Sequence, residues 1–161
     1  MDTLRISMWS GPRNISTALM YSFAQRPDTQ VVDEPLYAHY LAHSDARHYH
    51  PGAAEVLASQ ENDGAKVVRD LFLGPCPKPI LFLKNMTHHL VALDWAFLQQ
   101  LRNVLLIRHP RQVILSYAKN VPQPSLQDVG YAAQVDLLHY LQEHGQPVVV
   151  LDANEVLKNP R

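Results

Sequence analysis

Short apolar runs without helical spacing recur along the chain and alternate with segments of helical periodicity. Runs of this kind are typical of strands buried on both faces of a sheet. They occupy residues 4–9, 79–84, 103–108 and 147–152, with a weaker run at 29–33. Helical patterns lie between them at residues 16–25, 90–101, 111–119 and 126–144. This alternation predicts an α/β protein with a parallel sheet of about five strands, covered by helices on both faces in three layers.

The helix limits are marked in places by capping residues. Ser125 and Asp128 are candidate N-caps of the helix at 126–144, and Gly145 is suited to end it. Residues 36–77 are less regular, and we expect one or two helices there, in the stretches "AAEVLASQ" and "AKVVRDLFL". The length of 161 residues corresponds to a single domain covering residues 1–161.

Composition narrows the class of protein. A chain that is 47% hydrophobic and 18% charged is ordinary for a soluble globular domain, and its net charge of -1 argues against a nucleic-acid partner. We expect no signal peptide, because the first residues lack a basic segment followed by a long apolar one, and no apolar stretch approaches the roughly 20 residues of a membrane span. The single cysteine, Cys76, fits a reducing compartment. We therefore expect a cytoplasmic protein without a membrane partner; the oligomeric state stays open.

Most polar residues of interest follow the predicted strands. In parallel sheets of this kind, ligands bind beyond the carboxyl ends of the strands. The segments in that position are residues 10–17, 33–36, 84–89 and 108–111. Their convergence at one edge of the sheet predicts a functional site there.

The segment after the first strand has the features of an anion-binding loop. It reads "SGPRNIST" from Ser10 to Thr17 and leads into a helix, whose N-terminus offers free N–H groups to an anion. Arg13 adds a charge and a fork of donors, and Ser16 adds a hydroxyl. The glycine, lysine and hydroxyl of a nucleotide-hydrolase P-loop are missing. The alternative is an ordinary helix capped by Asn14 or Ser16.

A second basic segment follows the strand at 103–108. Arg108 ends this strand, and Ser116 lies eight residues further on, in a segment where Pro110 suits the first turn of a helix. An arginine at a strand end and a serine about two turns into the next helix can close on one phosphate.

In these two motifs the chain resembles the sulfotransferases that use 3′-phosphoadenosine 5′-phosphosulfate (PAPS), which have a P-loop-kinase-like fold. That family carries [KR]-S-G-[ST]-[ST] after its first strand, which Arg13, Ser16 and Thr17 match, and an arginine and a serine eight apart, matched by Arg108 and Ser116. The closing "LDANEVLKNP" is similar to the family's late "yEdL…P" turn. The resemblance implies that residues 13–17, namely Arg13, Asn14, Ile15, Ser16 and Thr17, bind the cofactor together with Arg108 and Ser116.

The chain departs from the family pattern at three points. Asn14 stands in place of serine and Ile15 in place of glycine, and a β-branched residue disfavours a positive φ. The chain also ends soon after its fifth strand, where family members continue with further helices and a basic loop. We expect either a fragment or a minimal form.

The resemblance also suggests catalytic residues. Lys84 ends the strand at 79–84, where a lysine in cytosolic family members contacts the bridging oxygen. The family's base histidine, two positions on, is replaced by Met86. Glu34 is our first candidate for the base, since other branches use a glutamate from this region and Pro35 favours an extended Glu34. The alternative is a solvated turn carboxylate.

His88 is a further candidate for a base. The alternative is that Thr87 caps the next helix and that His88 and His89 lie in its exposed first turn. The histidine pairs of this chain do not have the spacing of a metal site, and we expect no metal.

The sequence thus predicts transfer of a sulfuryl group from PAPS to a hydroxyl or amine of a small acceptor, leaving adenosine 3′,5′-bisphosphate. One alternative is a catalytically impaired domain that binds a nucleotide or a partner. A less favoured one is an ATP-dependent small-molecule kinase.

Overall fold

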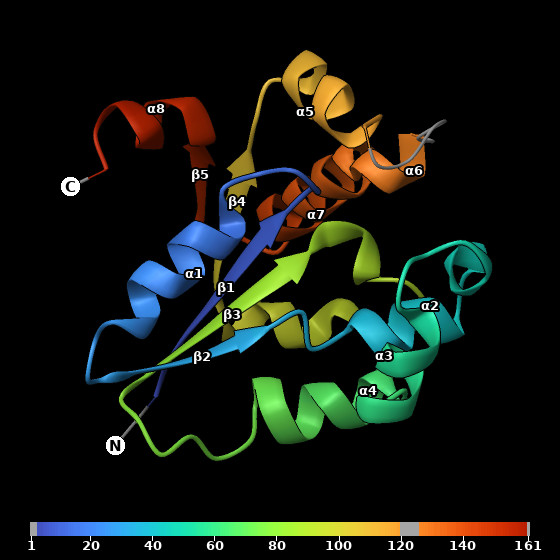
Figure 1. The fold of residues 1–161 in the computed structure, drawn as a ribbon. Helices are drawn as coiled ribbons and strands as arrows, with labels where there is room; N and C mark the ends of the chain where they lie inside the picture. The colour runs from blue at the N-terminus through green and yellow to red at the C-terminus, as the bar shows by residue number, and fades with distance from the viewer. Residues whose placement is uncertain (1–2, 120–125, 161) are drawn as a thin grey trace.

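Five parallel strands form one sheet in the order β2-β3-β1-β4-β5 (Figure 1). The structure is a computed structural model that describes residues 3–119 and 126–160. The strands are β1 Leu4–Ser10, β2 Thr29–Asp33, β3 Ile80–Met86, β4 Arg102–Ile107 and β5 Val148–Asp152. This confirms the predicted fold class and the five strands expected from the apolar runs.

Strand β1 lies at the centre of the sheet, and the predicted anion-binding loop follows its carboxyl end. It pairs with β3 from Leu4↔Ile80 to Ser10↔Met86 and with β4 on its other side. The chain runs from β1 outward to β2, returns to β3 and then crosses to β4, so the strand order reverses beside β1. A crevice forms at the carboxyl ends of strands at such a reversal.

Eight α-helices are found in the described residues. They are α1 Ser16–Ala24, α2 Tyr37–Ala42, α3 Ala53–Ser59, α4 Gly64–Val67, α5 Pro110–Tyr117, α6 Leu126–Val129, α7 Tyr131–Glu143 and α8 Ala153–Lys158. A π-helical turn, Val68–Phe72, continues α4, and 3₁₀ turns cover Asp45–His48, Thr87–His89 and Trp95–Gln100.

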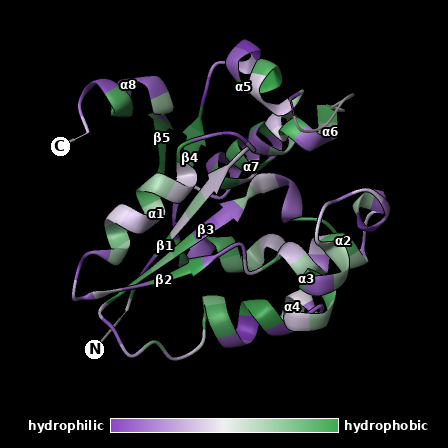
Figure 2. Cartoon of the chain, viewed as in Figure 1, coloured by the Kyte–Doolittle hydropathy of each residue, from purple (hydrophilic) through white to green (hydrophobic). Residues whose placement is uncertain are grey.

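Two hydrophobic clusters cover the two faces of the sheet. Side chains alternate between faces along each strand, so Met8 faces one cluster and Trp9 the other. The first face packs against α1 and the start of α8 through Met20 and Ala153. The second packs against α7 and the turns at Val68–Phe72 and Trp95–Gln100. The hydropathy of β3 turns from green to purple along its length in Figure 2, as apolar residues give way to Lys84 and Asn85.

The prediction of a helix over 90–101 is wrong. The chain forms a 3₁₀ turn at Thr87–His89 and a second one at Trp95–Gln100, with Ala92 at φ 48 between them. The carboxylate of Asp94 accepts the Ala96 N–H at 2.9 Å and begins the second turn. The apolar pattern that suggested a helix includes Phe97 and Leu98, and the short 3₁₀ turn buries both of these side chains.

The single helix predicted over 126–144 is interrupted. Gly130, at φ 74, separates α6 from α7, and Asp128 lies within α6 instead of capping it. The other proposed cap, Ser125, lies outside the described residues. The predicted stop at Gly145 is confirmed, because this residue adopts φ 64 directly after the helix.

Candidate functional site

The loop after β1 turns sharply before α1. Arg13 has φ 55, whereas Ile15 has φ -84 and is the N-cap residue of α1. The left-handed conformation therefore falls on Arg13. The expectation that Ile15 would conflict with a positive φ does not apply, because its own backbone is in an ordinary region.

Asn14 and Ile15 fasten this loop to the sheet. The Asn14 amide donates to the Leu106 carbonyl of β4 at 3.1 Å, and its oxygen accepts the Ile15 N–H at 2.9 Å. The Ile15 side chain packs against the cluster that contains Met8 and Met20. Both side chains thus support the loop from the core side, and they leave its outer side to other residues.

The start of α1 presents unpaired donors. Among the described residues no side chain caps this nine-residue helix, so neither Asn14 nor Ser16 plays the capping role considered above. The first helical bond runs from the Leu19 N–H to the Ile15 carbonyl at 3.0 Å. The N–H groups of Ser16, Thr17 and Ala18 therefore have no partner within the helix, which suits a bound anion.

Arg13, Arg108 and Ser116 lie together beside this helix start. Nε of Arg13 donates to Oγ of Ser116 at 3.0 Å, and Nη1 of Arg108 donates to the Arg13 carbonyl at 2.7 Å. Helix α5 begins at Pro110, as predicted, and places Ser116 two turns in. The hydroxyl of Tyr131 holds the strand end by donating to the Arg108 carbonyl at 2.6 Å. Loop and helix form one basic surface at the carboxyl edge of the sheet.

Lys84 is buried next to this surface and is held by two carboxylates. Only 3% of the residue is exposed. Its Nζ donates to Asp33 at 2.8 Å and to Glu34 at 2.5 Å. Burial lowers the pKa of Lys84, but the carboxylates, Glu34 foremost, outweigh it, and the pKa lies above its usual value. The ammonium group is therefore charged at neutral pH.

The backbone of Glu34 differs from the expectation. The predicted extended conformation is wrong, because Glu34 has φ 44. The Tyr37 N–H donates to the Glu34 carbonyl at 3.0 Å, so a tight turn connects β2 with α2. This turn directs the carboxylate toward Lys84, and only 21% of the side chain is exposed. Glu34 is not the freely solvated carboxylate of the alternative.

The two histidines at 88 and 89 are not on an exposed helix turn. Thr87 and His89 are buried, and the 3₁₀ turn that contains them begins without a side-chain cap from the described residues. Burial lowers the pKa of His88 to about 4, although the charge of Asp128 opposes the shift. Burial is also the main cause that holds the pKa of His89 well below its usual range. Both rings are neutral at pH 7. Nδ1 of each is buried without a hydrogen-bond partner in the described residues.

A cavity of about 130 Å³ joins these groups. It is lined by Pro12 of the loop, Glu34, Met86, the two histidines, Tyr37, His50 and Tyr117. The Tyr37 hydroxyl hydrogen-bonds Nδ1 of His50. Burial, and next the charge of Glu34, raise the pKa of Tyr37 to about 12. Thus the structure brings Glu34, from the end of β2, and Lys84 and His88, from the end of β3, close to the loop that follows β1.

Sequence reasoning missed the aromatic wall of this cavity. Tyr37, His50 and Tyr117 come from α2, a loop and α5. Only Tyr37 carried a signal, since it lies three residues after Glu34. The other two reach the cavity through tertiary packing, which no local pattern encodes.

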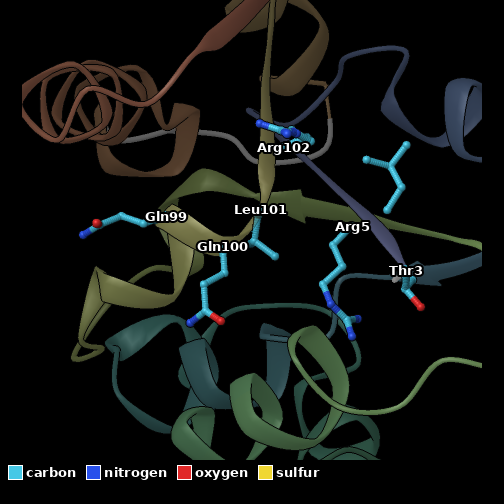
Figure 3. Close-up of a pocket in the computed structure, with 7 residues that line it drawn as sticks. Thr3, Arg5, Gln99, Gln100, Leu101 and Arg102 are labelled. Atoms are coloured by element: carbon cyan, nitrogen blue, oxygen red, sulfur yellow. The ribbon is translucent and has the colours of Figure 1, made fainter. Parts of the chain in front are cut away.

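A second cavity, of about 410 Å³, lies at the opposite, amino ends of β1 and β4 (Figure 3). Arg5, Gln99 and Gln100 contribute to its walls. Nη2 of Arg5 donates to the carbonyls of Leu73 and Gly74 at 3.2 and 2.9 Å. None of the predicted site residues lines this cavity, so we assign it no part in the candidate site.

The part of the chain that the structure describes contains no cluster of three or more His, Cys, Asp or Glu side chains that could hold a metal ion. Within residues 3–119 and 126–160, no helix has the length and apolar character needed to cross a membrane.

Comparison with known proteins assigns the family. The sulfotransferase domain family matches residues 4–161, and the chain belongs to this family. A crystal structure of a sulfotransferase from Alicyclobacillus acidocaldarius is similar over 99% of this chain and 77% of that chain, with a TM-score of 0.62. At 15% sequence identity this likeness shows the fold. The resemblance inferred from the two motifs is therefore confirmed.

Two Arabidopsis thaliana proteins are similar in sequence. They are named branched-chain-amino-acid aminotransferase-like proteins 2 and 1, and they are 37% and 38% identical over 156 residues, or 96% of this chain. The chain spans only 27% and 28% of their respective lengths.

Proposed function

We propose that this domain transfers a sulfuryl group from PAPS to a hydroxyl or amine of a small acceptor. The observation that carries the proposal is the joint placement of Arg13, Arg108 and Ser116 around an uncapped helix start, next to the buried Lys84–Glu34 pair. The residues fit an anionic donor, because unpaired backbone N–H groups and two guanidinium groups face the same edge of the sheet.

The donor supplies an activated sulfuryl group with a stable bisphosphate as its leaving group. In this proposal the N–H groups of Ser16 to Ala18 and Arg13 bind its 5′ portion, while Arg108 and Ser116 bind the 3′-phosphate. Lys84 neutralises the negative charge that develops on the bridging oxygen as the S–O bond breaks. These roles need no metal ion.

The acceptor must lose a proton as it attacks sulfur. Glu34 accepts this proton, since its carboxylate lies at the cavity beside Lys84 and is oriented by that contact. His88 is neutral and also lines the cavity, so it is the second candidate for the same role.

Calorimetric titration with adenosine 3′,5′-bisphosphate tests the donor site. We expect saturable binding that weakens at least about tenfold in Arg108→Ala, because a charge-assisted contact contributes roughly 1.5–3 kcal/mol. Arg69→Ala is the matched control, since Arg69 is an exposed arginine paired with Asp70 away from the site. Absence of binding to the wild-type chain would exclude the proposal. Displacement of the nucleotide by magnesium-ATP would favour the kinase alternative.

Glu34→Gln separates binding from chemistry. The neutral amide keeps the shape of the side chain, so nucleotide affinity should stay within about threefold, whereas turnover should fall by roughly 10² or more if Glu34 takes the proton. Sulfate transfer from labelled PAPS to a panel of hydroxyl and amine acceptors is the measurement. A full loss in His88→Gln with activity retained in Glu34→Gln would reverse the two roles.

A domain that binds the nucleotide without turnover is the second candidate. It is favoured by the pairing of Lys84 with two carboxylates, which satisfies its charge inside the protein. Tight binding of adenosine 3′,5′-bisphosphate without transfer to any acceptor in the panel would establish this second candidate.

A further inference from the structure

Behind His88 lies a third cavity, which the catalytic scheme does not use. Its volume is about 310 Å³, and Thr87, His88, Leu90, Trp95, Gly130 and Ala133 contribute to its walls. His88 also lines the 130 Å³ cavity beside Glu34. The imidazole ring is therefore a wall shared by two cavities, one next to the donor loop and one on its far side.

The larger cavity is mainly apolar and has a single ionisable group at its edge besides the histidine. Leu90, Trp95 and Ala133 supply apolar and aromatic surface. Asp136, an exposed residue of α7, is the only carboxylate among the described lining residues. Small-molecule sites combine an apolar wall with a few polar groups in this way, and their volumes begin near 300 Å³.

An unpaired polar atom lies on the side of His88 that faces Gly130. Nδ1 is buried and has no partner in the described residues. A Cβ at position 130 would come within 3.3 Å of this atom, so only glycine leaves the space beside it open. An unpaired buried nitrogen costs free energy, which a ligand that hydrogen-bonds to it would recover.

We propose that this cavity binds a small aromatic or similarly flat apolar molecule with a positively charged amine. The amine lies at the Asp136 carboxylate, the ring lies against Trp95, and a polar group near the other end of the molecule bonds Nδ1 of His88. Because the His88 ring separates this cavity from the one beside Glu34, the site is distinct from the proposed transfer site and does not rest on the proposed sulfuryl transfer.

Two probes of the same size and opposite charge test the inference on the 161-residue chain. They are 2-phenylethylamine and 3-phenylpropanoate, and their binding is followed by quenching of Trp95 fluorescence and by calorimetry. Trp95→Phe identifies the signal, because Trp9 is fully buried and stays as the second tryptophan. We expect saturable binding of the amine and a preference of about tenfold over the carboxylate, since attraction and repulsion at Asp136 add.

Variants connect this preference with the cavity. Asp136→Asn should reduce the preference to below about threefold. The matched control is Glu143→Gln, which removes one negative charge from an exposed position near the end of the same helix. Ala133→Leu narrows the cavity beside His88 and should weaken binding of the amine by more than tenfold. If that variant does not fold, Ala132→Phe, at an exposed position of the same wall, replaces it.

The inference is overturned if both probes bind equally, or if Ala133→Leu folds and binds the amine as wild type does. Titration with adenosine 3′,5′-bisphosphate on the same preparations separates this proposal from the proposed function. Nucleotide binding without amine binding rejects the cavity assignment alone. Amine binding without nucleotide binding keeps the cavity as a site and rejects sulfuryl transfer.

Discussion

Lys84 holds an ammonium group between two carboxylates at the end of a buried strand. A buried charge is tolerated only when it is paired and hydrogen-bonded, and here Asp33 and Glu34 supply both contacts. The same lysine is the group proposed to meet the leaving oxygen. Its structural and chemical roles therefore depend on the same pair of carboxylates.

Lys84→Met should destabilise the fold by about 2 kcal/mol. Removing one partner of a buried pair costs roughly 3–5 kcal/mol, and the value is reduced here because the Asp33 side chain is half exposed. The measurement is the midpoint of urea denaturation. The control is Lys66→Met, which removes one partner of the exposed Lys66–Glu61 ion pair. Since the folded pKa of Lys84 is raised, the difference should be constant below pH 10.5 and shrink as pH rises through the folded value. Equal costs for the two variants would contradict this account.

His88 predicts a loss of stability in acid. Its folded pKa of about 4 lies below the ordinary value of 6.5, so the unfolded chain binds the proton more readily. Stability is full above pH 6.5 and is lost as pH falls toward 4. One such group accounts for about 2 kcal/mol between pH 7 and pH 5. Chemical denaturation at both pH values should show that His88→Gln loses about that much less than wild type. An unchanged acid sensitivity would mean that His88 is solvated.

The placement of Arg108 and Ser116 was predictable because each follows a local rule. Arg108 directly follows an apolar strand, and helix geometry places Ser116 about two turns into α5. The work of Asn14 was not predictable, because its partner is the carbonyl of Leu106, 92 residues away in the sequence. The environment of His88 and His89 was likewise hidden, since the sequence pattern favoured an exposed turn and tertiary packing buries it.

At the scale of elements, the junction between α6 and α7 borders the 310 Å³ cavity through Gly130. Gly130 turns the chain at φ 74, and the end of α6 lies against the loop after β1, where a Cβ on Gly11 would meet the Val129 carbonyl at 2.6 Å. The sequence predicted one continuous helix here because a glycine inside an apolar period costs only about 1 kcal/mol and does not by itself indicate a break.

Gly130→Ala should be more harmful than Gly145→Ala. Both glycines have a positive φ, so placing alanine in this left-handed conformation should cost roughly 1–2 kcal/mol of stability at either position. Gly145 has open space around it, whereas a methyl group at 130 would also crowd Nδ1 of His88. Thermal denaturation of the two variants gives the comparison. Equal melting temperatures would show that the space beside His88 is adaptable.

Across the whole molecule, the sheet separates the edge proposed to bind the donor from an opposite edge whose contacts are structural. At the amino edge lies Arg5 (Figure 3). Its guanidinium donates to the carbonyls of Leu73 and Gly74. At the carboxyl edge the loop, the lysine and the histidines gather. The alternation of strands and helices predicted this division, because parallel strands present all their carboxyl ends to one side.

Arg5→Met should therefore affect stability and leave nucleotide binding unchanged. Two carbonyls lose a charged donor, at a cost of about 2 kcal/mol. Arg102→Met, an exposed arginine at the start of the neighbouring strand β4, is the control and should cost less than about 0.5 kcal/mol. Urea denaturation and calorimetry with adenosine 3′,5′-bisphosphate test both halves of the expectation. A weakened nucleotide affinity in Arg5→Met would show that the two edges are coupled.

The close approach of the Gly11 and Val129 main chains constrains how this domain can be changed by evolution or by engineering. The turn at Gly11, proposed to bind phosphate, and the corner that borders the 310 Å³ cavity lie main chain against main chain, without a side chain that could adjust between them. An insertion before Gly130 should therefore also displace the turn at Gly11. Transplanting either segment from a relative should succeed only when both are exchanged as one unit.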